Sequence, residues 1–328
     1  MIESITAVNY MGDAYTMHLR QPEKSGIIIR SITGLGPAKA TINTSALASA
    51  DGSIFNSSRL GERNIVIKMS FMSDTDDVES IRQKSYSVFP VKKKVTIYVK
   101  TNNRYVAIDG YVESNEPDIF SKDVQSSISV ICPNPYFYEV GPNSPQRTIF
   151  TGVDAEFEFF FEKARDYKVL GEDGFPLKGG VITLNDVVKL STISTTREKS
   201  IYYDGDEVNG ITMTIHAKEE VTGDITIRNL ETHEYMKIYA DKLEKLTGSH
   251  LMPFDELVIC TVTGAKGVTL IRDGIMYNAL NCIGKDADWF QLGIGDNLFG
   301  YFVEGEDIAE KHSKINLEIV NTVIYEGV

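Results

Sequence analysis

The sequence predicts a mainly β protein made of two domains. Three observations predict this class: many short runs of β-branched and aromatic residues between turn residues, one stretch with helical periodicity, and a proline-rich segment near the middle. A chain of 328 residues that is 42% hydrophobic has enough apolar side chains for two cores. We therefore expect residues 1–140 and 141–328 to fold as separate domains.

The first domain is expected to be a β-barrel or β-sandwich. Residues 95–99 and 105–112 alternate apolar and polar side chains around Asn102-Asn103, which is the pattern of a hairpin. Further strand-like runs are residues 65–71 and 127–132. These runs predict a sheet with one buried face, which needs a covering element.

One helix is expected over residues 75–89. Acidic residues open this stretch, basic residues follow, and Pro90 ends it, as the helix dipole and the missing proline N–H favour. Val78, Ile81, Ser85 and Val88 fall on one stripe at helical spacing. The pattern predicts that this helix packs on the sheet of the first domain.

The second domain is expected to be a β-sandwich of the jelly-roll type. Short strand-like runs recur along it, separated by turn signals such as Asp273-Gly274. The runs are residues 181–184, 211–217, 224–228, 235–239, 257–262, 268–271, 298–303 and 315–320. The junction before it, residues 133–147, contains four of the ten prolines of the chain.

The charge distribution supports a boundary at the same place. Residues 1–140 contain 15 acidic and 15 basic residues, out of 46 and 33 in the whole chain, which leaves 31 acidic and 18 basic residues for 141–328. The whole net charge of −13 therefore lies in the second half. Such a domain would repel nucleic-acid phosphates, which argues against nucleic-acid binding there.

Residues 34–64 stand out because they are long, rich in small and polar residues, and without helix or strand periodicity. A segment of this kind inside a compact domain is either disordered or functional. Leu47, Ile54, Phe55 and Leu60 argue against disorder and favour a loop with apolar anchors that packs against a neighbouring subunit. An ordered surface loop without a partner is the alternative.

The sequence contains few signs of catalysis or metal binding. No nucleophile-elbow, zinc-protease, Walker or C-x-x-C motif occurs, and the three cysteines are widely spaced, so we expect buried free thiols and no cofactor or metal. Asp204, Asp206 and Glu207 could form a glycosidase or calcium site or an ordinary acidic turn. Trp289 could be a sugar-stacking platform, although its place before Leu292 favours a core anchor.

Three motifs resemble those of one family. They are DGSIFNSSRLGERNIVI at 51–67, PDIFS at 117–121 followed by ISVICPNPYFY at 128–138, and WFQLGIGDN at 289–297, which is similar to a W-x-x-L-x-x-G-x-N turn. Together and in this order they resemble the distal tail protein family of tailed bacteriophages.

This resemblance implies a structural, non-enzymatic virion protein. It implies a ring-forming first domain, assembled as a homo-hexamer at the end of the tail tube around a channel for the tape-measure protein and DNA, and a galectin-like second domain. The subunit interface implied for the ring comprises Asp51, Gly52, Phe55, Arg59 and Arg63.

The implied partners are the tail tube protein, the tail tip or baseplate hub protein, the tape-measure protein and receptor-binding proteins. DNA would be met only in transit. The absence of a secretory leader or a long apolar run leads us to expect synthesis in the host cytoplasm and no membrane insertion. The resemblance implies a location at the virion tail tip or baseplate. A stand-alone carbohydrate-binding β-sandwich protein and a glycoside hydrolase are the alternative functions.

Overall fold

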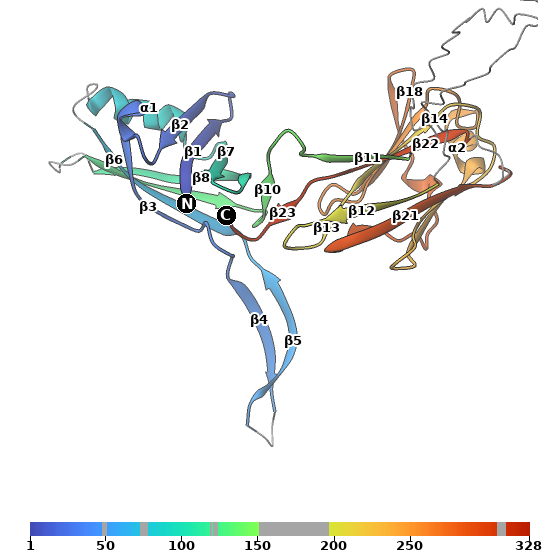
Figure 1. Ribbon diagram of the computed structural model, residues 1–328, viewed down its shortest axis with the longest axis horizontal. Coiled ribbons are helices and arrows are strands. Elements are labelled where there is room, and N and C mark those ends of the chain that lie inside the picture. Colours follow the sequence, from blue (N-terminus) through green and yellow to red (C-terminus); the bar gives the residue numbers. More distant parts are fainter. Residues whose placement is uncertain (48–50, 73–77, 119, 121–123, 151–196, 307–312) are drawn as a thin grey trace, which may run out of the picture.

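The computed structural model describes residues 1–328 except 48–50, 73–77, 119, 121–123, 151–196 and 307–312. The described chain consists of two β-rich lobes, with one long hairpin that projects away from the first lobe (Figure 1). The predicted mainly β class is confirmed. No helix among the described residues is long and apolar enough to span a membrane.

The first lobe is built on a nine-stranded sheet. Seven of its strands run in the order β2-β1-β7-β8-β9-β6-β3, and β10 pairs with both β8 and β23. The strands are β1 (Ile2–Asn9), β2 (Ala14–His18), β3 (Ile27–Thr33), β6 (Arg63–Phe71), β7 (Lys94–Thr101), β8 (Tyr105–Asp118), β9 (Gln125–Cys132), β10 (Phe137–Glu139) and β23 (Ile324–Tyr325), with a 3-10 turn η1 at Pro22–Lys24. All four strand-like runs predicted for this region lie on these strands.

The predicted helix packs against one face of this sheet, over β1 and β6. Side chains alternate between buried and partly exposed along β7 and β9, as strand geometry requires. The helix, α1 (Val78–Val88), buries Ile81, Ser85 and Val88 against the core, and Val78 packs at its border. The predicted stripe is confirmed, whereas the predicted first residues of the helix lie outside the described residues.

The second lobe contains two facing sheets. The six-stranded sheet has the order β11-β22-β14-β17-β18-β19, and the four-stranded sheet has the order β12-β21-β15-β16. The strands are β11 (Gln146–Phe150), β12 (Glu198–Tyr203), β14 (Thr212–Ala217), β15 (Ile225–Asn229), β16 (Tyr235–Ile238), β17 (Glu256–Cys260), β18 (Gly267–Arg272), β19 (Ile275–Asn278), β21 (Gly295–Val303) and β22 (Ile315–Asn321). Smaller elements are the pair β13 (Asn209–Gly210) and β20 (Gln291–Leu292), the helix α2 (Ala240–Thr247) and the 3-10 turn η2 (Leu280–Cys282).

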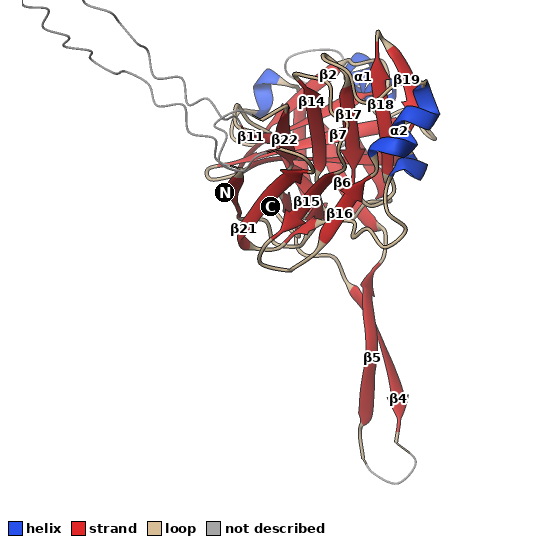
Figure 2. Ribbon diagram, turned by 90° about the vertical axis from the view of Figure 1, so that its right-hand side faces the viewer, coloured by secondary structure: helices blue, strands red, loops and turns tan. Residues whose placement is uncertain are grey.

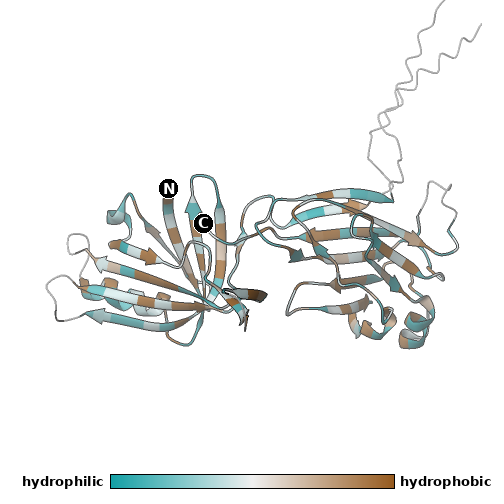
Figure 3. Cartoon of the chain, turned by 90° about the horizontal axis from the view of Figure 1, so that it is seen from below, coloured by the Kyte–Doolittle hydropathy of each residue, from teal (hydrophilic) through white to brown (hydrophobic). Residues whose placement is uncertain are grey.

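The core of this lobe lies between the two sheets. Phe150 of β11 and Tyr301 of β21 come from opposite sheets, and their rings meet edge to face with centroids 6.2 Å apart. Hydrophobic and hydrophilic residues alternate along the strands of both lobes (Figure 3), which is how the apolar set of each strand reaches the core. Each predicted strand-like run from 211 to 320 overlaps a strand. The run 181–184 lies outside the described residues, and α2 was not predicted.

The C-terminal end of the chain belongs to the sheet of the first lobe. Strand β23 pairs antiparallel with β10, with Phe137 opposite Tyr325 and Tyr138 opposite Ile324. The chain therefore crosses from the first lobe to the second and returns at its end (Figure 1). The domain boundary at residue 140 stays a prediction, and the tail from Ile324 to Val328 does not follow it.

The expectation of a loop without strand periodicity at 34–64 is wrong. The segment contains two antiparallel strands, β4 (Ala40–Ala46) and β5 (Ser53–Leu60), which form a two-stranded sheet outside both lobes (Figures 1 and 2). A strand buried on one face alternates apolar with polar residues, whereas nearly every residue of this hairpin is exposed. The alternation used to recognise strands is therefore missing. We call β4 and β5 the arm.

Candidate subunit interface

A β-bulge sets the two faces of the arm. Asn43 lies opposite Ser57 but Thr44 lies opposite Phe55, so Asn56 is an extra residue in β5. Its side-chain amide donates to Ser45 Oγ at 2.6 Å. Without this extra residue the alternation would put Phe55 on the face of Ser45. The bulge instead moves Phe55 to the face that carries Ile42.

This face of the arm is apolar and open. Ile42 is 55% exposed and Phe55 is 60% exposed, while Leu60 at the base of the same face is partly buried. The other face carries polar residues and Ile54. A two-stranded hairpin is marginally stable alone in water, and side chains of this size stabilise by about 1.5–3 kcal/mol each when buried. The arm therefore has an apolar face that finds no cover within the described chain.

Four of the five residues assigned to the interface by resemblance lie on the arm. Asp51 and Gly52 lie near its tip, and Phe55 and Arg59 lie on β5, all of them exposed. Gly52 has φ +101°, a conformation that side chains rarely adopt, and no atom lies within 4 Å of the place a Cβ would take. Glycine at this position is explained by backbone conformation, since no close packing requires it.

The fifth residue, Arg63, is not on the arm surface. It begins β6, is only 3% exposed, and its guanidinium donates to four carbonyl oxygens of its own chain. Nε donates to Pro135 O at 2.6 Å, Nη1 to Gly34 O and Gly36 O, and Nη2 to Glu326 O at 2.6 Å. In this chain Arg63 is a structural clamp, and its assignment to an intersubunit contact stays a prediction that these contacts do not support.

The carbonyls bound by Arg63 come from three separate segments: the root of the arm, the proline-rich junction and the C-terminal tail. Burial lowers the pKa of the Arg63 guanidinium, and the four carbonyl acceptors offset the cost of keeping that charge away from water. Gly34 is part of the same root: it has φ +86°, and a Cβ there would lie 2.1 Å from Asn64 O. The arm therefore leaves the first lobe at a fixed position.

A second arginine holds the C-terminal tail. Arg104 Nη1 donates to Gly327 O at 3.2 Å, its guanidinium lies 4.1 Å from the centre of the Tyr325 ring, and Nη2 lies 3.6 Å from Asp206 Oδ1. Asp206 Oδ2 also accepts from the backbone N–H of Glu326 at 3.0 Å. Asp206 was considered for a glycosidase or calcium site, and the structure uses it to join the second lobe to the tail.

The other candidate sites are also placed by the structure. No group of histidine, cysteine or acidic side chains that could hold a metal ion occurs among the described residues. Cys132, Cys260 and Cys282 are free thiols, of which Cys260 is only partly buried. Trp289 is partly buried at the border of the core with Lys266 Nζ 5.6 Å from its ring centre, whereas its neighbour Phe290 is fully buried.

The W-x-x-L-x-x-G-x-N motif forms a tight turn. Leu292 is fully buried, Gly295 has φ +100°, and Asn297 is 3% exposed inside the turn. The Asn297 side chain accepts from the Gly293 N–H at 2.9 Å and donates to Gly293 O at 2.8 Å and Gly295 O at 3.1 Å. The leucine, glycine and asparagine positions of the motif therefore each have a structural reason within the second lobe.

Comparison with known proteins relates the first lobe to a protein family and the whole chain to solved structures. Residues 22–148 match the family described as phage tail protein RIFT-related domain. Among solved structures, the chain is similar to the Dit protein (gp 19.1) of SPP1, described as a paradigm of the hub adsorption apparatus in phages that infect Gram-positive bacteria. The TM-score is 0.59 at 9% identity, over 97% of this chain and 98% of that one.

Two further similar structures are the phage p2 baseplate in its activated conformation with Ca and with Sr, both with a TM-score of 0.47 and 10% identity. The first covers 98% of both chains and the second 97% of both. Comparison with curated proteins gives no match. The resemblance found in the three motifs is thus confirmed: the chain contains a phage tail protein domain at residues 22–148 and has the fold of a distal tail protein.

Proposed function

We propose that this protein is a structural component of a phage or phage-like virion, and that it forms a ring of six copies at the distal end of the tail. In this proposal the first lobe forms the ring around the channel for the tape-measure protein and DNA, and the second lobe projects outward. The observation that carries the proposal is the arm, a long hairpin with an uncovered apolar face on a phage tail protein domain.

The arm would join one copy to the next. Ile42 and Phe55 would leave water against the neighbouring first lobe, and Arg59 and Asp51 would border that contact. Arg63 holds the root of the arm at a fixed position, so the arm is already oriented before assembly. Preorganisation of this kind lowers the entropic cost of association.

The further assignments follow from the ring. The tail tube protein would bind on one side of it and the tail tip or baseplate hub protein on the other, at the tail tip or baseplate of the virion. The second lobe, which we propose to be galectin-like, would be available for receptor-binding or baseplate proteins. The function needs no catalytic group and no cofactor.

The test is the mass of the assembled protein in solution. We expect native mass spectrometry of the purified protein to show a homo-hexamer, and deletion of residues 40–58 to yield a folded monomer. A sharper variant is Ile42→Asp combined with Phe55→Asp, which places charges on the apolar face of the arm and should also prevent assembly.

The matched control is Asn43→Asp combined with Ser45→Asp, since these exposed residues lie on the opposite face of the same strand and neither lies across from Arg59. This control should still assemble. A wild-type protein that stays monomeric at high concentration would disprove the ring. A hexamer that tolerates the charges on Ile42 and Phe55 would disprove the role of the arm.

A further inference from the structure

Residues 322–328 lie between the two lobes and contact both of them. Only Thr322 and Val323 separate β22, which belongs to the second lobe, from β23, which belongs to the sheet of the first lobe. Figure 1 shows this segment, in red, crossing from one lobe to the other. Two residues span at most about 7 Å, so a displacement of the second lobe acts directly on the residues that follow.

The second lobe holds the tail with the loop that follows β12. The Asp206 N–H donates to Ile324 O at 2.9 Å, and Asp206 Oδ2 accepts from the Glu326 N–H at 3.0 Å. The Tyr203 hydroxyl accepts from the Ile324 N–H at 3.3 Å and donates to Glu207 O at 2.9 Å. Tyr203 is fully buried in the core of the second lobe. The loop therefore ties two alternate residues of the tail to that core.

On its other side the tail contacts the root of the arm, residues 34–36. Arg63 Nη2 donates to Glu326 O at 2.6 Å, and Nη1 of the same guanidinium donates to the first and third carbonyl oxygens of the root. The second carbonyl oxygen, that of Leu35, accepts from the Val328 N–H at 3.1 Å. The three carbonyls of the root are thus shared between Arg63 and the tail.

The backbone of the tail also lies against the root. A Cβ at Gly327 would lie 3.3 Å from Leu35 O, 3.3 Å from the carbonyl carbon of Gly36 and 3.3 Å from Pro37 Cδ. These distances are shorter than most van der Waals contacts of a Cβ. Glycine leaves this space empty, which lets the tail approach the root closely.

Glu326 is the residue at which the two lobes meet. Its N–H is bound by Asp206 of the second lobe, and its carbonyl oxygen is bound by Arg63 of the first. Strand β23, just before it, is buried in the sheet, whereas residues 326–328 are partly exposed. A partly exposed segment that is held by hydrogen bonds opens at a lower free energy than a buried strand. Residues 326–328 can therefore leave the root while β23 stays in place.

We propose that residues 326–328 couple the arm to the second lobe. With Asp206 in place, these residues stay on the root and the arm keeps one orientation. When the second lobe moves and Asp206 leaves Glu326, they leave the root and the arm loses that orientation. The coupling is a property of a single chain. Its consequence for the ring rests on the proposed function: a tail protein that shifts the second lobe would change how firmly each copy holds the next.

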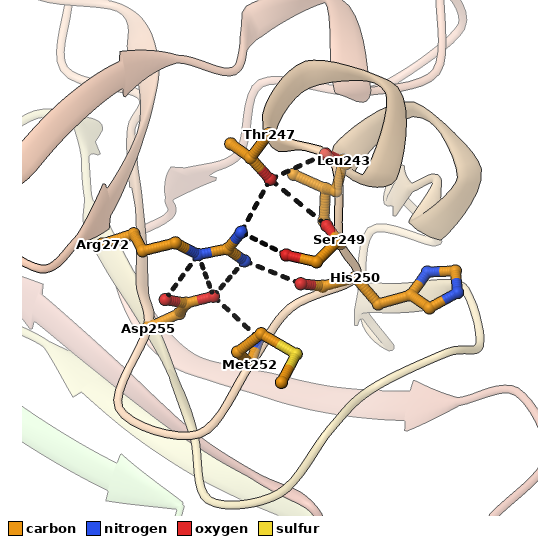
Figure 4. Close-up of polar contacts among 7 residues, drawn as sticks. All are labelled: Leu243, Thr247, Ser249, His250, Met252, Asp255 and Arg272. Atoms are coloured by element: carbon orange, nitrogen blue, oxygen red, sulfur yellow. Dashed lines mark hydrogen bonds and ion pairs between the residues drawn. The ribbon is translucent and has the colours of Figure 1, made fainter.

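Another arginine cluster, drawn in Figure 4, shows what a clamp within one lobe looks like. Arg272, at the end of β18, binds Asp255 with Nε 3.0 Å from both carboxylate oxygens. Its Nη1 donates to Thr247 Oγ1 at 2.8 Å and to Ser249 Oγ at 2.6 Å. These partners all belong to the second lobe, so the cluster stabilises that lobe without reaching the tail. It therefore supplies a control for loss of stability in the second lobe alone.

The test is a distance between the arm and the first lobe, measured by double electron–electron resonance. Spin labels on p-acetylphenylalanine replace Ser53 on β5 and Lys68 on β6, which are both exposed, so the cysteines need no change. The Ile42→Asp, Phe55→Asp variant is the background, at a dilution that leaves the chains monomeric, because assembly would hold the arm by other contacts. We expect one narrow distance in this background and loss of that single distance on Asp206→Ala.

Three variants separate the coupling from a general loss of stability. Asp206→Asn should keep the single distance, because its side-chain oxygen still accepts from the Glu326 N–H. Asp204→Ala removes an exposed carboxylate of the same loop, and Ser249→Ala removes a hydrogen bond to Arg272. Both should keep the single distance as well. Its loss in these variants, or its retention in Asp206→Ala, overturns the coupling.

The result on monomers does not depend on whether the ring forms. A wild-type protein that stays monomeric overturns the proposed function, and loss of the single distance on Asp206→Ala would still support the coupling. A wild-type hexamer together with an unchanged distance in that variant overturns the coupling alone. Where the ring forms, Asp206→Ala in the otherwise wild-type chain should raise the concentration needed for assembly, because fewer chains then have an oriented arm. Unchanged assembly would contradict the consequence for the ring.

Discussion

The guanidinium of Arg63 lies 4.8 Å from the centre of the Phe137 ring, which joins the first residue of β6 to the first residue of β10. Phe137 is fully buried, and it pairs across the sheet with Tyr325 of the C-terminal strand. The contact between Arg63 and Phe137 therefore lies where the arm, the proline-rich junction and the C-terminal tail meet. The position of the arm and the course of the chain between the lobes depend on the same contact.

Arg63→Ala should destabilise the first lobe by more than about 1–3 kcal/mol, the usual cost of leaving one buried acceptor without its donor, because four acceptors are affected. Four carbonyl oxygens would lose their donor in a site that water reaches poorly. Denaturant unfolding monitored in the first lobe measures the change. Arg59→Ala, an exposed arginine on the arm, is the control and should change stability by less than about 0.5 kcal/mol. Equal effects of the two variants would contradict the clamp.

Arg104→Ala should loosen the attachment of the two lobes without unfolding either one. The change removes contacts to Gly327, Tyr325 and Asp206, which together hold the tail to β8 and to the second lobe. We expect faster proteolytic cleavage within residues 133–147, as well as a larger radius of gyration in small-angle scattering. Arg147→Ala is the control, because its ion pair with Glu318 lies within the second lobe. Unchanged cleavage of the Arg104 variant would show that the contacts of Arg104 do not hold the two lobes together. It would also weaken the proposed boundary near residue 140.

The sequence predicted those parts of the fold in which one face of a helix or strand is buried, because such elements have apolar residues at regular spacing. Helix α1 and the strands of both lobes alternate apolar with polar residues at helix or strand spacing, because each buries one face. The arm has no buried face, so its residues follow no such alternation and its strands were missed. The apolar side chains at 54 and 55 nevertheless indicated a contact surface, because they contradicted disorder.

Contacts between distant segments left no local signal. Arg63 binds the carbonyl of Glu326, and Arg104 binds that of Gly327. Nothing near Arg63 in the sequence shows that its partners are backbone carbonyls rather than a neighbouring subunit.

Stability should fall at high pH because buried thiol and phenol groups resist ionisation, among them Cys132 and Tyr203. Burial raises the pKa of the Cys132 thiol to about 12 and that of the Tyr203 hydroxyl to about 12. In the unfolded chain these groups ionise near pH 8.5 and 10, so the unfolded state alone releases their protons above those values. Folding is therefore unaffected below about pH 8.5 and progressively disfavoured from there to about pH 12, by up to ~1.4 kcal/mol per pH unit for each group.

Between about pH 8.5 and 10 the slope comes from the buried thiols, because burial raises the pKa of Cys282 as well as that of Cys132. Cys132→Ala should therefore reduce the slope of unfolding free energy against pH from about pH 8.5 upward, without abolishing it. Tyr203→Phe should reduce the slope only above about pH 10, where Tyr138, Tyr301 and Tyr325, whose pKa burial also raises, keep contributing. Denaturant titrations at half-unit pH steps separate the two. The same slope in Cys132→Ala as in the wild type would show that the thiol is not buried as described.

Asn297→Ala should destabilise the second lobe by about 1–3 kcal/mol, since the substitution leaves buried backbone groups of the 293–297 turn without partners. The stability of this turn then depends on Asn297 and on the core residues beside it, rather than on Trp289. Phe290→Ala, at a fully buried ring that meets Phe299 edge to face at 5.6 Å, should cost about 3–5 kcal/mol. Trp289→Ala should cost less than Phe290→Ala, because its ring is only partly buried. The three variants are compared by denaturant unfolding of the second lobe, and a larger loss for Trp289→Ala than for Phe290→Ala would show that the tryptophan is the principal anchor of the turn.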